Sequence, residues 1–377
     1  VEVERLERAY LAEAEKYFAA PIPEESAIAE RITRFEVWPA WKYIPKFLAI
    51  AEAKPGDEAA FRSCQWIFER TWNVGNDDSQ IFDADQKAWQ ILAAHHTGRD
   101  ELPTLCLRAV SYRGPAQEKF LRDLVARADL PRRAKAFATV ALAELLAQKH
   151  STVEYLGVKS KHPADEFARY IERRKSPQWG QDLIPANAAQ FKAESIRLFR
   201  TAISQYEDVP ITVSAPYFRD FKTLGEKART SLHALEHLTL GSPAPNIVGK
   251  DLNGEPLDLS NYRGNVVLLT FWSTGCGPCL AAIPEEQKLL KKFQRHGFAI
   301  LAVSRDQDAD VARNTVKERG IEWRSWFDGA NGPIARDYNV LGLPTTFLLD
   351  QRGRIVAKDL DGVELETKIS KLLEKKQ

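Results

Sequence analysis

The chain has 377 residues, a length that favours more than one domain. Its 53 basic and 52 acidic residues leave a formal net charge of +1, so no basic surplus argues for binding to nucleic acid or to an anionic membrane. The apolar fraction of 44% is typical of globular proteins, and no apolar run is long enough to span a bilayer.

The first residues, VEVERLERAYLAEAEKYF, are charged and amphipathic, unlike a secretory signal peptide. The chain also lacks an initiator Met, so we interpret it as a processed or truncated form. The absence of a signal segment therefore says little about location. Apolar residues recur here every three or four positions, which predicts a helix that buries Val3, Leu6, Tyr10, Ala14 and Tyr17.

Helical periodicity continues to about residue 240. Helix pairs separated by short Pro, Gly and Asp stretches predict an antiparallel array, of the tetratricopeptide or HEAT kind, although no fixed repeat period is evident. Residues 1–240 are therefore predicted to form an all-α domain, whose charged faces are solvated and which can present a groove to a protein partner. Further helices are predicted after the N-cap Asp57 and at 82–96, 129–150 and 186–209.

The composition changes at LTLGSPAPNIVGKD, residues 238–251. Gly241, Pro243 and Pro245 break the helical pattern, and we interpret them as the start of a linker. The next segment, 246–259, is predicted to be a hairpin that turns at the Asn253-Gly254 pair. A domain boundary is therefore expected between residues 240 and 241.

Strands and helices alternate in the remainder of the chain. The apolar run NVVLLTFW at 265–272 predicts a strand buried on both faces. This alternation predicts an α/β domain over residues 241–377, in which helices cover a central sheet. Its other predicted elements are helices at 281–297, 308–320, 332–340 and 366–376, strands at 298–304 and 322–327, and a hairpin within 344–360.

Two of the four cysteines, Cys276 and Cys279, form a CxxC motif in FWSTGCGPCLAAIP. Such a motif occurs in zinc sites and in redox pairs, but structural zinc needs a second pair of ligands. Cys64 and Cys106 are isolated in the other domain, and His296 stands alone. We therefore expect no metal and no organic cofactor. Cys64 and Cys106 are interpreted as separate buried residues, although an oxidising compartment would allow them to pair.

The position of the motif favours redox chemistry. The pair follows a predicted strand and opens a helix, so a Cys276 thiolate would face the positive end and free N–H groups of that helix. This placement lowers a cysteine pKa and favours the reactive thiolate. Gly277 and Pro278 would form the first turn. Cys279 would lie beneath the first sulfur and could resolve a mixed disulfide.

Other side chains in the sequence have simpler interpretations. Trp272, at the end of the strand, is expected to pack against the helix and to shape the rim beside the sulfurs. His233 and His237 share a helix face, but no third metal ligand is identifiable, which favours a packed or solvated pair.

Residues from about Pro243 to Leu373 resemble the thioredoxin fold, and within it the TlpA/ResA-type thiol-disulfide oxidoreductases. The segments that carry this resemblance are GSPAPNIVGKDLNGEPLDLSNYRG, VVLLTFW, CGPC, the following Pro284, and LGLPTTFLLDQRGRI. The helical region before them is similar to the N-terminal extensions of some exported bacterial TlpA-like proteins.

The resemblance implies a cis peptide bond between Leu343 and Pro344, beside the sulfurs. It also implies that Leu343, Pro344 and Thr345 offer backbone groups to an extended substrate. The implied partners are a protein or small disulfide substrate and a second redox protein. The implied location is periplasmic or elsewhere in the bacterial cell envelope.

Three positions depart from the family pattern. Gly275 stands where a Trp is usual, and Thr270 and Ala282 stand where related proteins carry an acidic residue. That acid would exchange a proton with the buried cysteine, so slower exchange or a different pH dependence is expected. Glu285 and Glu286 lie nearby but beyond Pro284, and we assign neither of them this role.

The leading hypothesis is an enzyme that exchanges disulfides, with Cys276 as the attacking thiolate and Cys279 as the resolving one. The alternative is a protein-binding scaffold whose thioredoxin-like domain is weakly active or vestigial. A peroxidase of the peroxiredoxin kind fits less well, because such enzymes place a Thr three residues before the reactive cysteine, and this chain has Ser273 there.

Overall fold

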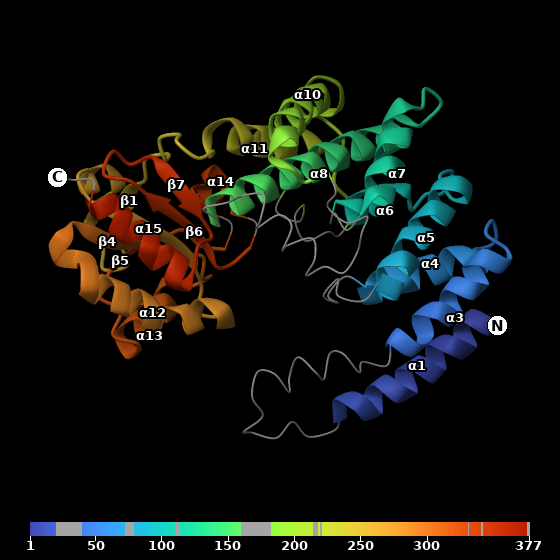
Figure 1. The fold of residues 1–377 in the computed structure, drawn as a ribbon, viewed down its shortest axis with the longest axis horizontal. Coiled ribbons are helices and arrows are strands. Elements are labelled where there is room, and N and C mark those ends of the chain that lie inside the picture. Colours follow the sequence, from blue (N-terminus) through green and yellow to red (C-terminus); the bar gives the residue numbers. More distant parts are fainter. Residues whose placement is uncertain are drawn as a thin grey trace. The chain divides into compact units, whose positions relative to one another are not determined.

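In the computed structural model the chain forms two compact units, Val1–Ser195 and Ile196–Gln377. The described part of the first unit is helical, whereas the second unit contains a sheet covered by helices (Figure 1). The structure describes residues 1–19, 40–71, 79–110, 114–159, 182–213, 218, 221–330, 332–340 and 342–374.

Helices of the first unit pack mainly against helices that are close to them in the chain, as an array does (Figure 1). The predicted N-cap is present, since the Asp57 carboxylate accepts a hydrogen bond of 2.8 Å from the Ala60 N–H. Membership of a particular repeat family stays a prediction. The helices are α1 (Glu2–Ala19), α3 (Ala40–Ala53), α4 (Glu58–Thr71), α5 (Ser79–His95), α6 (Leu102–Ala109), α7 (Pro115–Ala126), α8 (Arg132–Lys159) and the first part of α10 (Ala188–Tyr206).

Aromatic side chains join the first helices of this unit. The Trp66 ring stacks on Phe47 with 4.0 Å between centroids and meets Tyr10 edge-on at 5.1 Å. Cys64 and Cys106 are both buried free thiols and do not form a disulfide. Val3, Leu6, Tyr10 and Ala14 are buried, as the sequence predicted, whereas the side chain of Tyr17 lies outside the described part of the chain.

The second unit is built on a five-stranded sheet with the order β5-β4-β3-β6-β7. Strands β3, β4 and β5 run parallel, β6 pairs antiparallel with β3, and β7 pairs antiparallel with β6. A separate hairpin of β1 and β2 turns at Gly254, whose φ of 86° suits glycine. The strands are β1 (Val248–Lys250), β2 (Pro256–Asp258), β3 (Val266–Trp272), β4 (Phe298–Ser304), β5 (Arg324–Phe327), β6 (Thr345–Leu349) and β7 (Ile355–Lys358).

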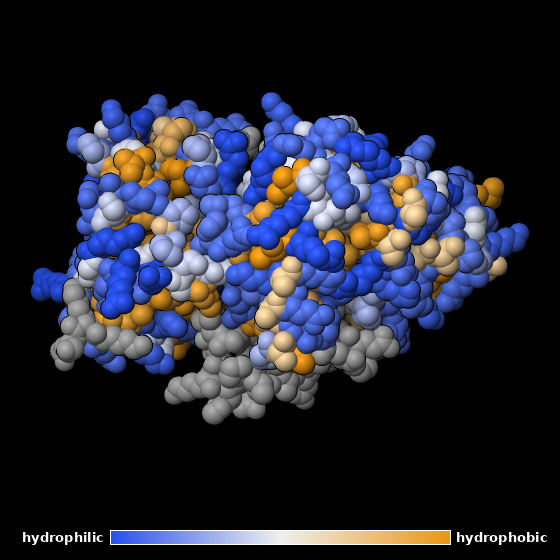
Figure 2. Space-filling view, turned by 90° about the horizontal axis from the view of Figure 1, so that it is seen from above, coloured by the Kyte–Doolittle hydropathy of each residue, from blue (hydrophilic) through white to orange (hydrophobic). Residues whose placement is uncertain are grey.

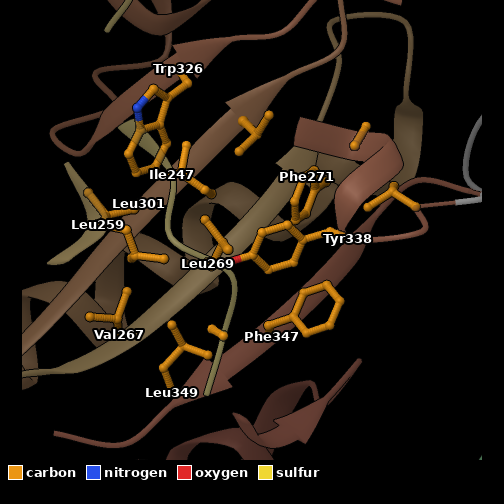
Figure 3. Packing of buried hydrophobic residues seen from close by; sticks show 14 of the residues in the cluster. Ile247, Leu259, Val267, Leu269, Phe271, Leu301, Trp326, Tyr338, Phe347 and Leu349 are labelled. Carbon is orange, nitrogen blue, oxygen red and sulfur yellow. The ribbon is translucent and has the colours of Figure 1, made fainter. Parts of the chain in front are cut away.

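The central strand β3 is buried along its whole length because both faces of the sheet are covered. Its odd-numbered residues join a core with the β1–β2 hairpin and α14, where Phe271 meets Tyr338 and Phe347 (Figure 3). Its even-numbered residues Thr270 and Trp272 face α12. The helices of this unit are α11 (Leu224–His237), α12 (Gly277–Phe293), α13 (Ala309–Glu318), α14 (Pro333–Asp337) and α15 (Gly362–Glu374).

The segment predicted to be a linker is part of the second unit. The Gly241 N–H donates a hydrogen bond of 2.7 Å to the Ile355 carbonyl of β7, and the Ala244 N–H donates one of 3.0 Å to Gly353. Leu238 and Ile247 lie in the sheet core. The compact units accordingly divide at Ser195, before α11, while the domain boundary between 240 and 241 remains a prediction.

The face of the molecule in Figure 2 is mainly hydrophilic, and hydrophobic residues show between the charged ones in small patches. This distribution agrees with a chain of which 28% is charged. No helix in the described part of the chain has the length and apolar character needed to cross a bilayer.

Candidate active site

The candidate site lies where β3 ends and α12 begins. A short loop leaves the buried strand after Trp272, and Cys276 is the N-cap of the helix. Gly277 and Pro278 form its first turn, where the missing N–H of proline leaves no donor unpaired. The sequence therefore predicted the local placement of the motif correctly.

A disulfide joins Cys276 and Cys279, with an S–S distance of 2.04 Å and 5.2 Å between the Cα atoms. The two sulfurs differ in environment. Cys276 is half-buried, whereas Cys279 is only 5% exposed. A substrate in solution can therefore approach Cys276 more readily than Cys279.

The start of α12 also provides a favourable electrostatic environment for Cys276. Its Sγ accepts a hydrogen bond of 3.1 Å from the Cys279 N–H, one of the amides that have no partner within the helix. When the pair is reduced, the same N–H and the positive helix end would stabilise a Cys276 thiolate. The thiol that solvent reaches is thus the one that the backbone favours as an anion.

Asp306, at the end of β4, anchors the loop that carries Cys276. Its carboxylate accepts hydrogen bonds from the Thr274 N–H at 2.8 Å and the Thr274 hydroxyl at 2.7 Å, and from Ser304 at 2.8 Å. The adjacent Gly275 faces open space, with no atom within 4 Å of where a Cβ would lie. Sequence analysis did not identify Asp306, because its partner in the loop is 32 positions away.

Replacing Asp306 with Ala is expected to lower kcat/KM for disulfide exchange by about tenfold. Hydrogen bonds to a charged group contribute about 1.5–3 kcal/mol each, and without them Cys276 is held less firmly. The measurement is the rate of exchange with a disulfide peptide. Asp308→Ala is the matched control, because it removes a similar bond to the Asp310 N–H at the exposed start of α13. Equal rates for the two folded variants would contradict the anchoring role.

A second loop of the same unit reaches the cysteines. The Leu343–Pro344 peptide bond is cis, and Pro344 lines the same cavity as Cys279. Thr345 begins β6 opposite Phe271 of β3, and its hydroxyl donates a hydrogen bond of 2.8 Å to the Gly342 carbonyl. Pro344 is exposed, while Leu343 and Thr345 are half-buried. The register of β6 on β3 thus brings these distant residues to the redox pair.

A cavity of about 10 Å³ lies behind Cys279, between α12 and the sheet. This is about the room that one water molecule needs. Trp272 forms part of its wall, and the indole N–H donates a hydrogen bond of 3.3 Å to the Ser325 hydroxyl. Packing is therefore the visible role of Trp272. Thr270 and Ala282, the two positions where related proteins carry an acid, line this cavity as well.

The cavity nevertheless contains a carboxyl group, that of Glu286. This residue is only 8% exposed, and burial raises its pKa to about 7, although a hydrogen bond from the Thr270 hydroxyl opposes the rise. Helix α12 continues through Pro284, so Glu286 remains on the face of Cys279 and Ile283. The expectation that Pro284 separates Glu286 from the cysteine site is therefore wrong, because the helix does not end there. The available signal was an acid in an otherwise apolar i, i+4, i+7 stripe.

The remaining candidates, His233 and His237, are not among the residues that line the cavity behind Cys279. The rings of His233 and His237 are 4.7 Å apart on α11. Among the residues that the structure describes, no cluster of three or more His, Cys, Asp or Glu side chains is arranged to hold a metal ion. The site therefore consists of two cysteines, a proline loop and a buried carboxyl group.

Comparisons with known proteins concern the C-terminal part of the chain. Residues 240–358 match the AhpC/TSA family. A thiol-disulfide oxidoreductase ResA of Bacillus thuringiensis is 31% identical over 140 residues, which cover 37% of this chain and 80% of the relative. The ResA of Bacillus subtilis is 34% identical over 134 residues, which cover 36% and 74%. The solved thioredoxin domain of a thiol-disulfide oxidoreductase from Bacteroides vulgatus is 31% identical and covers 36% of this chain and 98% of that domain, with a TM-score of 0.34.

Proposed function

The chain belongs, through its C-terminal part, to the ResA family of thiol-disulfide oxidoreductases, and we propose that it exchanges disulfides with protein substrates through Cys276 and Cys279. The observation that carries this proposal is the asymmetry of the pair. The sulfur at the helix N-cap is accessible, whereas its partner is buried one turn below it. The Cys276 thiol can then attack a substrate, and the Cys279 thiol can resolve the mixed disulfide that forms.

The proposed reaction has two steps, written here for the reduced enzyme. The Cys276 thiolate attacks one sulfur of the substrate disulfide, the substrate S–S bond breaks, and the leaving thiolate takes a proton from water. Cys279, deprotonated, then attacks the Cys276 sulfur of the mixed disulfide. The second substrate thiol is released, the substrate has gained two electrons, and the enzyme disulfide has formed. The reverse sequence oxidises a dithiol substrate.

We propose that substrates lie along the loop of Leu343, Pro344 and Thr345. An extended peptide could pair with the backbone of this loop, as in strand addition. Gly275 and Gly277 support this proposal, because neither has an atom within 4 Å of where its Cβ would lie. The rim beside Cys276 therefore has room for a folded or bulky substrate.

We further propose an extracytoplasmic location, in which a second redox protein restores the cysteine pair. The resemblance to exported proteins supports this location, and exchange of disulfides is the chemistry that oxidising compartments require. The helical unit would then bind a protein partner. If the sulfur chemistry proved vestigial, this binding role would be the main one.

Cys279→Ser is expected to trap the enzyme covalently on a substrate. Cys276 still attacks the disulfide peptide, but a serine hydroxyl cannot displace the bound thiol, so a mixed disulfide accumulates. Intact-protein mass spectrometry should detect one added peptide chain. The double variant Cys276→Ser/Cys279→Ser is the control and should gain none. Turnover by the unchanged chain without any adduct on Cys279→Ser would contradict the proposed order of attack.

A further inference from the structure

We propose that Glu286 takes the proton from Cys279 when this cysteine resolves the mixed disulfide, and returns it in the reverse reaction. The proton would pass through the cavity that both side chains line with Thr270. This inference rests on the proposed function and deepens it, because it assigns the proton transfer of the second step to a particular carboxyl group.

The geometry of α12 directs the two groups to one space. Cys279 and Glu286 are seven residues apart, so they share a helix face and their Cα atoms are separated by about 10 Å along the axis. Helical side chains lean toward the N-terminus, which brings the Glu286 carboxyl back toward Cys279. Thr270 of β3 lines the same cavity, and its hydroxyl lowers the pKa of the Glu286 carboxyl group, against the effect of burial. A hydroxyl and one water molecule can bridge the remaining distance.

In the part of the chain that the structure describes, the walls of the cavity offer the carboxyl group no charged partner. Sheet strand β3 contributes Thr270 and Trp272, the segment before β5 contributes Ile321 and Trp323, and the proline loop contributes Pro344. Among the described residues that line the cavity, only Cys279 and Glu286 can ionise in the neutral range. Glu285 pairs with Lys288 instead, at 3.1 Å on the exposed side of the helix.

The Glu286 carboxyl group suits proton exchange because no cation stands beside it among the described residues of the cavity. An ion pair would hold Glu286 permanently ionised, whereas burial, opposed in part by Thr270, raises its pKa to about 7. Proton transfer is most effective when the pKa of the acid or base lies near the working pH. Near neutral pH, Glu286 can therefore both accept and donate a proton.

The proposed step balances in atoms and electrons. The Cys279 S–H proton moves through the Thr270 hydroxyl or a cavity water to the Glu286 carboxylate. The sulfur then bonds to Cys276 Sγ while the bond from Cys276 to the substrate sulfur breaks. The bonding electrons leave on the substrate thiolate, which takes a proton from water. In the reverse direction, the Glu286 carboxylic acid protonates the Cys279 thiolate as the pair opens.

The test separates the two steps with dithiobis-nitrobenzoate, an aromatic disulfide that releases a coloured thiolate at each step. The reduced chain releases the first thiolate when Cys276 attacks and the second when Cys279 resolves. In Glu286→Gln at pH 7, we expect the second release to slow by about 100-fold, the lower range for general acid–base catalysis. The rate of the first release should change by less than about twofold, because Glu286 lies beside Cys279 and takes no part in the attack by Cys276.

The pH profile supplies a readout that a merely structural role would not change. In the unchanged chain the second rate should rise with pH through about 7 and then level off, because the carboxylate is the base. In Glu286→Gln this plateau should vanish, and the rate should continue to rise toward the ordinary pKa of a thiol. Glu286→Asp should restore part of the rate, and Glu285→Gln, the matched control, should behave like the unchanged chain.

Two results would overturn the assignment of Glu286. One is an unchanged second rate and pH profile in folded Glu286→Gln, and the other is an equal slowing of both releases. In either case the proposed function would stand. Absence of a second release from the unchanged chain would instead contradict the disulfide exchange on which this inference rests.

Discussion

Cys276→Ser is expected to reduce disulfide exchange to the background rate of a solution without enzyme. A serine hydroxyl cannot form the mixed disulfide, and Cys279 is too buried to replace Cys276 as the first nucleophile. The fold should persist, because the lost disulfide spans a sequence separation of only 3 and closes a very short loop. The measurement is kcat/KM with a disulfide peptide, with circular dichroism as a check of folding.

The matched control for this variant is Cys64→Ala. Cys64 is a buried thiol of the helical unit, and burial raises its pKa to about 12, so it stays protonated and unreactive. Its removal should leave exchange intact and cost only stability. Retained turnover in Cys276→Ser would contradict the assignment of Cys276 as the attacking nucleophile. Partners that bind equally well to the unchanged chain and to Cys276→Ser/Cys279→Ser would favour the scaffold function.

Glu286→Gln is expected to increase the stability of the C-terminal unit at pH 8 by about 3 kcal/mol. Burial raises the pKa of Glu286 from 4.5 to about 7, so between these values the folded chain binds more protons than the unfolded chain. The stability that this proton binding contributes is present below pH 4.5 and is lost as pH rises through about 7. Each pKa unit corresponds to about 1.4 kcal/mol, and an uncharged glutamine avoids the loss.

Hydrogen exchange of peptides from β3 and α12, followed by mass spectrometry between pH 4 and 9, would measure this difference in the full chain. The free energies of opening should agree at pH 4, diverge between about pH 4.5 and 7, and differ by a constant amount at higher pH. Glu285→Gln is again the control, because Glu285 is ion-paired at the surface. A difference that does not change with pH would show that the Glu286 carboxyl is not buried as a titrating group.

Elements with strong local signals were predicted from the sequence. The run VVLLTFW is β3, the Asn253-Gly254 pair is the turn of the β1–β2 hairpin, and the cysteine motif opens α12. Each of these depends on residues close together in the chain: an apolar run, a glycine with positive φ, or a proline in the first turn of a helix.

The segment from Gly241 to Pro245 was predicted to begin a linker, but it packs against the sheet. This packing depends on contacts between distant segments, which a local pattern does not reveal. Gly241, Pro243 and Pro245 break a helix wherever they occur, and a local pattern cannot tell a free connection from one that is packed. Only the fold brings Gly241 to the Ile355 carbonyl of β7, Ala244 to the Gly353 carbonyl in the turn before β7, and Leu238 into the core of the sheet.

By itself, the sequence determined the two-part organisation, the fold class of the C-terminal part and the position of the cysteine pair at the start of a helix. Tertiary structure decided which other groups accompany this pair. Asp306 reaches Thr274 from the end of a neighbouring strand, and Glu286 shares a cavity with Thr270 of β3. Both depend on contacts between distant segments, and burial, which sets the pKa of a carboxyl group, exists only once those segments have packed together.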